Sequence, residues 1–215
     1  LKDYVYTNAS NESYTIETAK FFISNIKLTD NQGNDYILPK KESYFLIDAA
    51  LDSTLFPRFT IPQGEYTSIE FNIGIDSMTN TLPIEDRIGV LDIAKSDMYW
   101  SWNAGYIFFK LEGHSPQSTT LDKKFRYHIG LYGGYNSPTV NNNRNIKIDL
   151  NIAGVAKVQK DMSADIHLMV DLGKIFDGPN TISIANHPTV MTSGPHQLIA
   201  ENYSKLFTHD HTHNF

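Results

Sequence analysis

The sequence predicts an all-β fold, specifically an antiparallel β-sandwich with Greek-key-like connections and one or two short helices. Three observations favour this class. Apolar and polar residues alternate over short segments, turns rich in Gly, Pro and Asn separate these segments, and helical periodicity is nearly absent. Strands that follow one another so closely are typical of antiparallel sandwiches.

The clearest predicted strand runs from Tyr66 to Ile75, where apolar and polar residues alternate, and it follows a turn that contains Pro62 and Gly64. The other expected strands span residues 14–28, 44–48, 106–112, 124–131, 145–152 and 164–171. Turn-forming stretches separate them at residues 30–34, 113–116, 133–138 and 141–143. Two short helices are expected around residues 172–176 and 198–206.

Composition narrows the possible functions. With 215 residues and 40% hydrophobic residues, the chain can bury a core of its own, and without repeats or linkers we expect one domain over residues 1–215. The absence of cysteine excludes disulfides, thiolate metal sites and a cysteine nucleophile. A net charge of −6 argues against binding to nucleic acid. No apolar run is long enough to span a bilayer, so no transmembrane segment is expected.

No catalytic signature is present: the sequence lacks GxSxG, HExxH, GxxxxGK[ST] and GxGxxG. Carboxylates are scattered through a region that reads as loop, but any β-rich domain offers such residues. They are Asp76, Glu85, Asp86, Asp92 and Asp97. We therefore expect a protein that is not an enzyme.

Residues 98–113 form the most unusual stretch, because they contain both tryptophans of the chain, Trp100 and Trp102. In an extended strand two residues at this spacing project from the same face. Two interpretations of such a pair stay open on the residues alone. The rings can be packed in a core, or they can form a surface platform on which a sugar or another ligand stacks.

This stretch resembles the MbnP-like family of periplasmic copper-binding proteins. The similarity lies in Trp100-Ser-Trp102, Gly105-Tyr106 and Lys110-Leu-Glu-Gly113. It extends to residues 21–28, 64–76, 127–130 and 202–207 and to the pair His211 and His213. Because the segments occur in the expected order over most of the chain, the chain is identified as a member of this family.

The resemblance implies that Trp100 is oxidised to kynurenine by a partner, a dihaem enzyme of the MauG/cytochrome c peroxidase type. Kynurenine and histidines would then hold one copper ion as Cu(I). An intact indole offers only an N–H donor, whereas the arylamine of kynurenine offers a nitrogen lone pair, and nitrogen ligands suit copper. The resemblance thus implies a protein of copper homeostasis that is periplasmic or extracellular.

Four histidines are the candidate partners of Trp100. His128 lies on a strand whose apolar residues Phe125, Tyr127 and Ile129 alternate with it, so it points away from the apolar face. His167 shares a face with Met169, which pairs an imidazole with a soft thioether. Each can instead be an ordinary strand residue.

The C-terminal segment 209–213 holds three imidazoles and a carboxylate, and its His211 and His213 are the remaining candidates. The alternative is a frayed terminus that binds metal adventitiously. A second function class also stays open: a surface-associated sandwich that binds glycan or protein through exposed aromatic residues, of which 12 tyrosines and 12 phenylalanines offer many.

The given sequence begins with Leu1 instead of an initiator methionine and does not open with a signal-peptide pattern. We therefore expect a trimmed or mature chain that has lost an upstream part. A strand, a metal ligand or a lipid anchor to the outer membrane would belong to that part.

Overall fold

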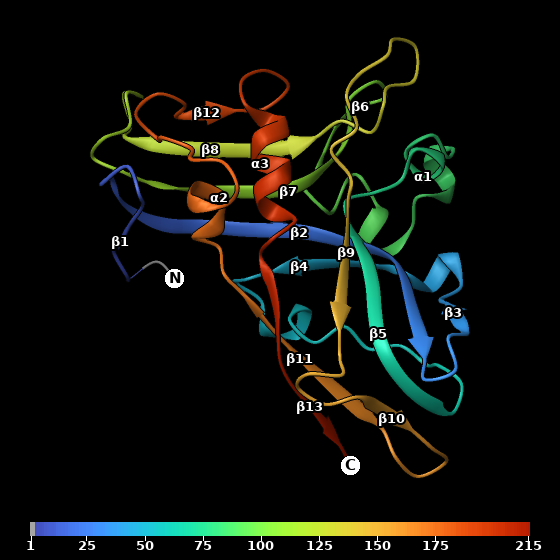
Figure 1. Ribbon diagram of the computed structural model, residues 1–215. Helices are drawn as coiled ribbons and strands as arrows, with labels where there is room; N and C mark the ends of the chain where they lie inside the picture. The colour runs from blue at the N-terminus through green and yellow to red at the C-terminus, as the bar shows by residue number, and fades with distance from the viewer. Residues whose placement is uncertain (1–2) are drawn as a thin grey trace.

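The computed structural model describes residues 3–215, so the expectation about an upstream part at Leu1 lies outside the described residues. Most strands join one large sheet, and two form a separate ladder (Figure 1). The hydrogen-bonded path through the large sheet is β10 (Ala156–Val158), β5 (Gly64–Ile73), β2 (Ser13–Asp30), β7 (Gly105–His114), β8 (Lys124–Gly130) and β12 (Thr189–Val190). Strands β1 (Tyr6–Thr7), β3 (Asp35–Ile37) and β4 (Tyr44–Asp48) pair with β2, β6 (Tyr99–Ser101) pairs with β7, and β9 (Arg144–Asp149) pairs with β5. The ladder consists of β11 (Ala164–Val170) and β13 (Phe207–Asn214).

The all-β prediction is confirmed, and each strand expected from the sequence is present. The expected helices correspond to α2 (Lys174–Asp177) and α3 (His196–Tyr203). A third helix, α1 (Ser77–Asn80), and four 3-10 turns were not expected: η1 (Lys40–Glu42), η2 (Asp52–Thr54), η3 (Ile84–Asp86) and η4 (Gly89–Leu91). Most strands that sequence patterns missed have only two or three residues, too few for a period of two to be recognised. The pair β12–β8 is parallel, an exception to the antiparallel arrangement.

Strand β2 connects the two halves of the large sheet. Its first part pairs with β7 and its second part with β5, with a register shift between Ser24 and Lys27. At this bulge Asn25 has a φ of 53°, in the left-handed region that asparagine tolerates better than most residues. At the bulge the Ile26 N–H donates to the side-chain hydroxyl of Ser43 at 2.7 Å, so this backbone group keeps a hydrogen-bond partner. The bulge therefore allows β2 to pair with β7 in one half of the sheet and with β5 in the other.

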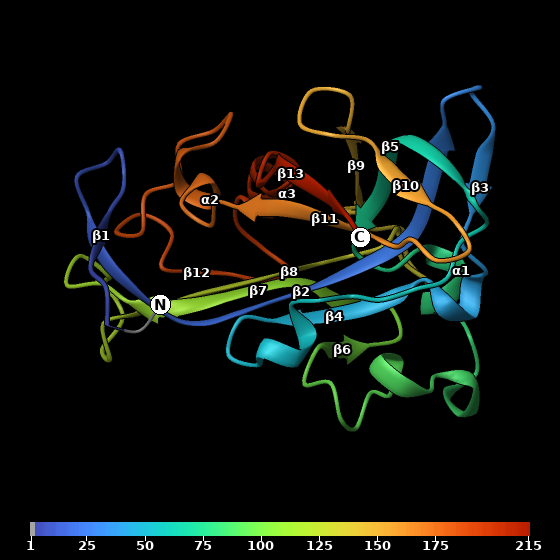
Figure 2. The ribbon, with the colours of Figure 1, turned by 90° about the horizontal axis from the view of Figure 1, so that it is seen from below.

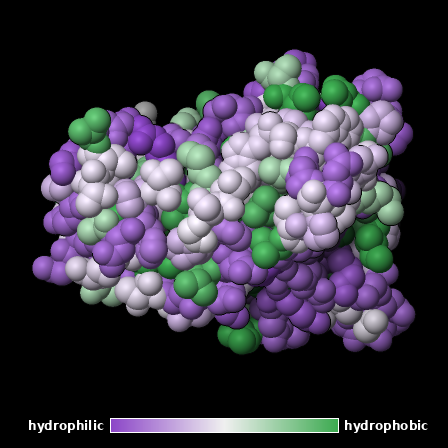
Figure 3. Space-filling model, turned by 90° about the horizontal axis from the view of Figure 1, so that it is seen from above, coloured by the Kyte–Doolittle hydropathy of each residue, from purple (hydrophilic) through white to green (hydrophobic). Residues whose placement is uncertain are grey.

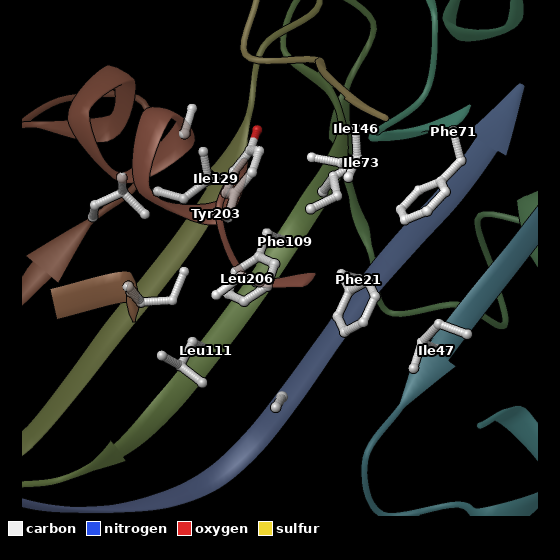
Figure 4. Packing of buried hydrophobic residues seen from close by; sticks show 14 of the residues in the cluster. Phe21, Ile47, Phe71, Ile73, Phe109, Leu111, Ile129, Ile146, Tyr203 and Leu206 are labelled. Atoms are coloured by element: carbon white, nitrogen blue, oxygen red, sulfur yellow. The ribbon is translucent and has the colours of Figure 1, made fainter. Parts of the chain in front are cut away.

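Two apolar clusters cover opposite faces of the sheet. The main core lies beneath α2, α3 and the β11–β13 ladder and includes Phe21, Phe109 and Tyr203 (Figure 4). On the other side, Met98, Tyr106 and Phe108 belong to a second cluster built on the segment that contains β6. Figure 2 shows α2, α3 and the ladder on one side of the sheet and β6 on the other. Strand β7 is consequently buried on both faces, which explains its nearly continuous apolar sequence.

The outer surface is mainly polar. Seen from above, hydrophobic residues are scattered among hydrophilic ones and do not form one continuous patch (Figure 3). Singly exposed apolar residues of this kind are normal on a folded domain.

Glu12 fastens the N-terminal segment to the loop before β12. Its buried carboxylate accepts the backbone N–H groups of Ile184 at 2.7 Å and Ala185 at 2.8 Å, and the Ser183 hydroxyl at 2.8 Å. The Asn8 side-chain amide donates a further bond at 2.8 Å. Burial by itself raises the pKa of Glu12, but these hydrogen bonds outweigh it and hold the pKa below the usual 4.5.

We expect Glu12→Gln to lower the free energy of unfolding by about 2–4 kcal/mol, because a charged acceptor of several buried donors is lost. Since the folded-state pKa is depressed, this stabilisation is complete above pH 4.5 and disappears as the pH falls through the folded value. Urea unfolding at neutral and acidic pH measures it, with the exposed Glu85→Gln as control. A difference between wild type and Glu12→Gln that does not shrink in acid would contradict this role.

Candidate functional site

Trp100 lies on β6 and packs over β8. Strand β6 pairs antiparallel with β7, with Tyr99 opposite Tyr106. The half-buried indole packs against the second cluster and lies directly over Gly130. A Cβ atom on Gly130 would stand 2.9 Å from Cζ3 of Trp100 and 2.4 Å from the carbonyl oxygen of Tyr106. Only glycine therefore allows the indole to lie this close to the β8 backbone.

His128 lies on the same face of β8, two residues before Gly130. Its neighbours Phe125, Tyr127 and Ile129 are in the main core, as the alternation predicted, while His128 points to the opposite face. The imidazole Nε2 is 2.6 Å from Oε1 of Glu112, and the side chains are 13% and 25% exposed. Strand alternation thus places His128 next to the part of β8 that Trp100 covers.

Two further charged residues, Lys110 and Asp97, lie near His128. Lys110 stands directly opposite His128 across β7 and β8, and its Nζ is 2.7 Å from Oδ2 of Asp97. Burial lowers the pKa of His128, and Glu112 opposes the effect. The Lys110 ammonium lowers the pKa of Asp97, although burial works against it. Trp100, His128, Glu112, Lys110 and Asp97 together form what we call the β8 site.

The chemistry of the β8 site follows from the Glu112 contact. A neutral imidazole next to an ionised carboxylate donates its Nε2–H to that carboxylate, which leaves the Nδ1 lone pair free. A carboxylate that fixes the tautomer of a histidine in this way is a common partner of metal-binding imidazoles. His128 can therefore serve as a nitrogen ligand through Nδ1.

The other predicted ligands lie elsewhere. His167 on β11 stands opposite His211 on β13, with ring centroids 4.1 Å apart, and the His213 ring is 6.1 Å from that of His211. The histidine-rich terminus is thus an ordered strand and not a frayed tail. This ladder covers the main core, whereas β6, which carries Trp100, lies on the opposite side of the sheet (Figure 2). Trp100 and His128 therefore share one face of β8, and the other three histidines lie together on the ladder on the opposite side of the sheet.

The expected common face of the two tryptophans is not realised, because β6 ends at Ser101. Trp102 lies in the following turn with 41% of its surface exposed. Its ring stacks on the buried guanidinium of Arg87, whose Cζ is 4.6 Å from the indole centroid and 5.2 Å from that of Tyr99. Trp100 and Trp102 therefore have different surroundings.

Sequence reasoning did not assign Arg87, Asp97, Lys110 or Glu112 to a site. The sequence could have indicated Lys110 and Glu112 as site residues. They are two charged residues at alternate positions of an otherwise apolar strand, and such residues need partners when they are buried. No sequence pattern identifies Arg87 or Asp97, which reach their places through the long segment between β5 and β6.

Residues 3–215 show neither a ready metal-binding group nor a membrane-spanning helix. In that part of the chain, no three or more His, Asp or Glu side chains converge, in the rotamers that they adopt, closely enough to hold a metal ion. Likewise, none of the helices between residues 3 and 215 has the length and apolar character needed to cross a membrane.

Fold and site together define an all-β protein with an indole over Gly130 of β8 and an imidazole two residues away on the same face of that strand. The family model described as MbnP matches residues 1–192, and the chain belongs to the MbnP family. The solved structure of MbnP from Methylosinus trichosporium is similar, with a TM-score of 0.56 and 17% sequence identity over 88% of this chain and 73% of that one. At this identity the likeness shows a shared fold. A search of the curated proteins finds no match.

Gly130→Ala tests the packing of Trp100. We expect the added methyl to displace the indole towards solvent, with a red-shifted tryptophan emission and a destabilisation of about 1–3 kcal/mol. The measurement uses a Trp102→Phe background, so that Trp100 is the single emitter. Gly64→Ala is the matched control, because a Cβ there meets Tyr66 at an ordinary 3.4 Å. Unchanged emission in Gly130→Ala would show that the indole does not lie over β8.

Proposed function

We propose that this protein binds one copper ion, as Cu(I), at the β8 site after Trp100 has been oxidised to kynurenine. The observation that carries the proposal is the position of the Trp100 ring over Gly130, two residues from His128 on the same face of β8. Membership of the MbnP family supports it. The protein would sequester or deliver copper, with no turnover of its own.

The donor set explains why the modification matters. His128 contributes one imidazole, and the intact indole of Trp100 contributes no lone pair in the ring plane. Oxidative cleavage of the indole C2–C3 bond is a four-electron oxidation that adds two oxygen atoms, and hydrolysis then releases C2 as formate. The product carries a free arylamine. This nitrogen would supply a second donor at a site that otherwise has one, and two nitrogen ligands suit monovalent copper.

The oxidation needs an external oxidant, because the side chains around Trp100 cannot accept four electrons. We propose a dihaem enzyme of the MauG/cytochrome c peroxidase type as the partner that accepts the four electrons and passes them to peroxide. The partly exposed Trp100 is the substrate of that enzyme. Such a pair of proteins would work in the periplasm or outside the cell, where we place this chain.

The residues around His128 prepare it for this role. Burial favours the neutral imidazole, and Glu112 holds the Nε2–H, so that Nδ1 is the available ligand atom. Lys110 and Asp97 neutralise each other beside it at 2.7 Å. Because Lys110 and Asp97 offset each other, Glu112 is left as the negative charge beside His128. Through its hydrogen bond to the imidazole, the Glu112 carboxylate would stabilise the positive charge of a Cu(I) ion bound at Nδ1.

Three variants made together with the oxidising enzyme test the proposal in a Cu(I) competition titration. We expect Trp100→Phe and His128→Gln each to weaken binding by at least about tenfold, since each removes a ligand, and Glu112→Gln to weaken it by about 10–100-fold by releasing the imidazole. Trp102→Phe is the matched control and should bind normally. Cu(I) affinity that is unchanged in Trp100→Phe would contradict the proposal.

A second candidate function is binding of a glycan through exposed aromatic rings. Trp102 and Tyr135 are 41% and 60% exposed, their ring centroids are 6.0 Å apart, and with Thr81, Pro83 and Asn136 they line a hollow of about 350 Å³. Flat rings beside a shallow hollow can stack on an apolar sugar face.

If this surface binds glycans, Tyr135→Ala should reduce retention on a glycan array, and chelators should have no effect. Leu121→Ala, an exposed apolar residue elsewhere, is the control. An array on which the unsubstituted protein retains no glycan would exclude this candidate.

A further inference from the structure

A second group of potential metal ligands lies on the outer face of the β11–β13 ladder. On β11, Asp165 and His167 are exposed, while Ile166 and Leu168 turn inward to the main core. On β13, His211 and His213 are exposed. Strand alternation therefore gathers three imidazoles and one carboxylate on a single solvent-facing surface.

The register brings these residues within reach of one ion. His167 is directly opposite His211, and Asp165 is directly opposite His213. Opposed residues of an antiparallel pair have Cβ atoms about 4.5–5.5 Å apart, and a zinc–nitrogen bond is about 2.0–2.1 Å long, so two opposed imidazoles can share an ion. The rings of His167 and His211 stack at 4.1 Å with an angle of 16° between them. They do not converge as they lie, but exposed side chains change rotamer within nanoseconds.

A bulge in β13 adds a residue that orients His211. The register shifts between His167 and Leu168, so that Asp210 is the extra residue between His209 and His211. Oδ2 of Asp210 is 2.9 Å from Nδ1 of His211. A carboxylate that accepts the Nδ1–H leaves Nε2 free to ligate, the same arrangement that other metal-binding histidines use.

We propose that His167, His211 and His213, with Asp165 or water completing the coordination, form a site for a divalent ion of the Cu(II) or Zn(II) class. Imidazole and carboxylate ligands suit such ions. The site is separate from the β8 site, since the two lie on opposite sides of the sheet. Strand β13 also lies beyond residue 192, where the family match ends, so two of the ligands come from a part of the chain outside that match.

The test is a Zn(II) titration by calorimetry, with Cu(II) binding followed by electron paramagnetic resonance, in a Trp100→Phe background that lacks the kynurenine precursor. We expect His167→Gln and His211→Gln each to reduce Zn(II) affinity by at least about tenfold. His187→Gln, which removes an exposed histidine from a loop, is the matched control and should leave the affinity unchanged.

His167→Gln is the decisive variant, because His167 is far from the terminus in sequence and joins it only through the ladder. If this variant binds Zn(II) as tightly as its parent, the terminal histidines chelate by themselves and the proposed site is wrong. If Trp100→Phe removes Zn(II) binding that the unsubstituted protein has, the site is not separate and the proposal also fails. Zn(II) should in addition slow amide exchange in β13 of the parent but not of His167→Gln. None of these outcomes depends on whether Cu(I) binds at the β8 site.

Discussion

Strand β7 is covered on both faces, by the main core on one side and by the segment that contains Met98 and β6 on the other. A strand in this position leaves little solvent to its charged side chains, yet it contains Lys110 and Glu112, which are 10% and 25% exposed. Burying either charge without a partner would be costly. Asp97 pairs with the first and His128 with the second. The groups that surround the candidate copper ligand are therefore the ones that allow β7 to be buried.

Hydrogen bonds at the start of β7 hold the segment that carries Trp100 in place. The Asn80 side chain accepts the Tyr106 N–H at 3.0 Å and donates to the Ile75 carbonyl at 2.7 Å, which ties the end of α1 to the start of β7. Gly105, with a φ of 77°, lets the chain reverse between β6 and β7 where Asn80 leaves no space for a Cβ. The Trp100 indole thus rests on a fixed backbone, and a ligand set supported in this way needs little rearrangement to bind a metal.

The sequence was informative where a pattern was long enough to carry a period. The alternation in β2 and β5 predicted both strands and their buried faces, and the alternation in β8 placed His128 opposite the apolar residues. Strand β13 was missed because its alternating residues are histidines and other polar residues, a pattern without an apolar face to recognise. Its partner β11 determines its conformation. The early end of β6 at Ser101, which separates Trp102 from Trp100, also depends on tertiary contacts.

Mass spectrometry of the protein from its native host reads the chemical state of the Trp100 side chain directly. Conversion of tryptophan to kynurenine exchanges one carbon for one oxygen, a gain of about 4 Da. In protein that carries copper, we expect this gain on the peptide that contains Trp100, assigned by fragmentation to residue 100 with Trp102 unchanged. Copper-loaded protein in which Trp100 has the mass of unmodified tryptophan would contradict the proposed copper site.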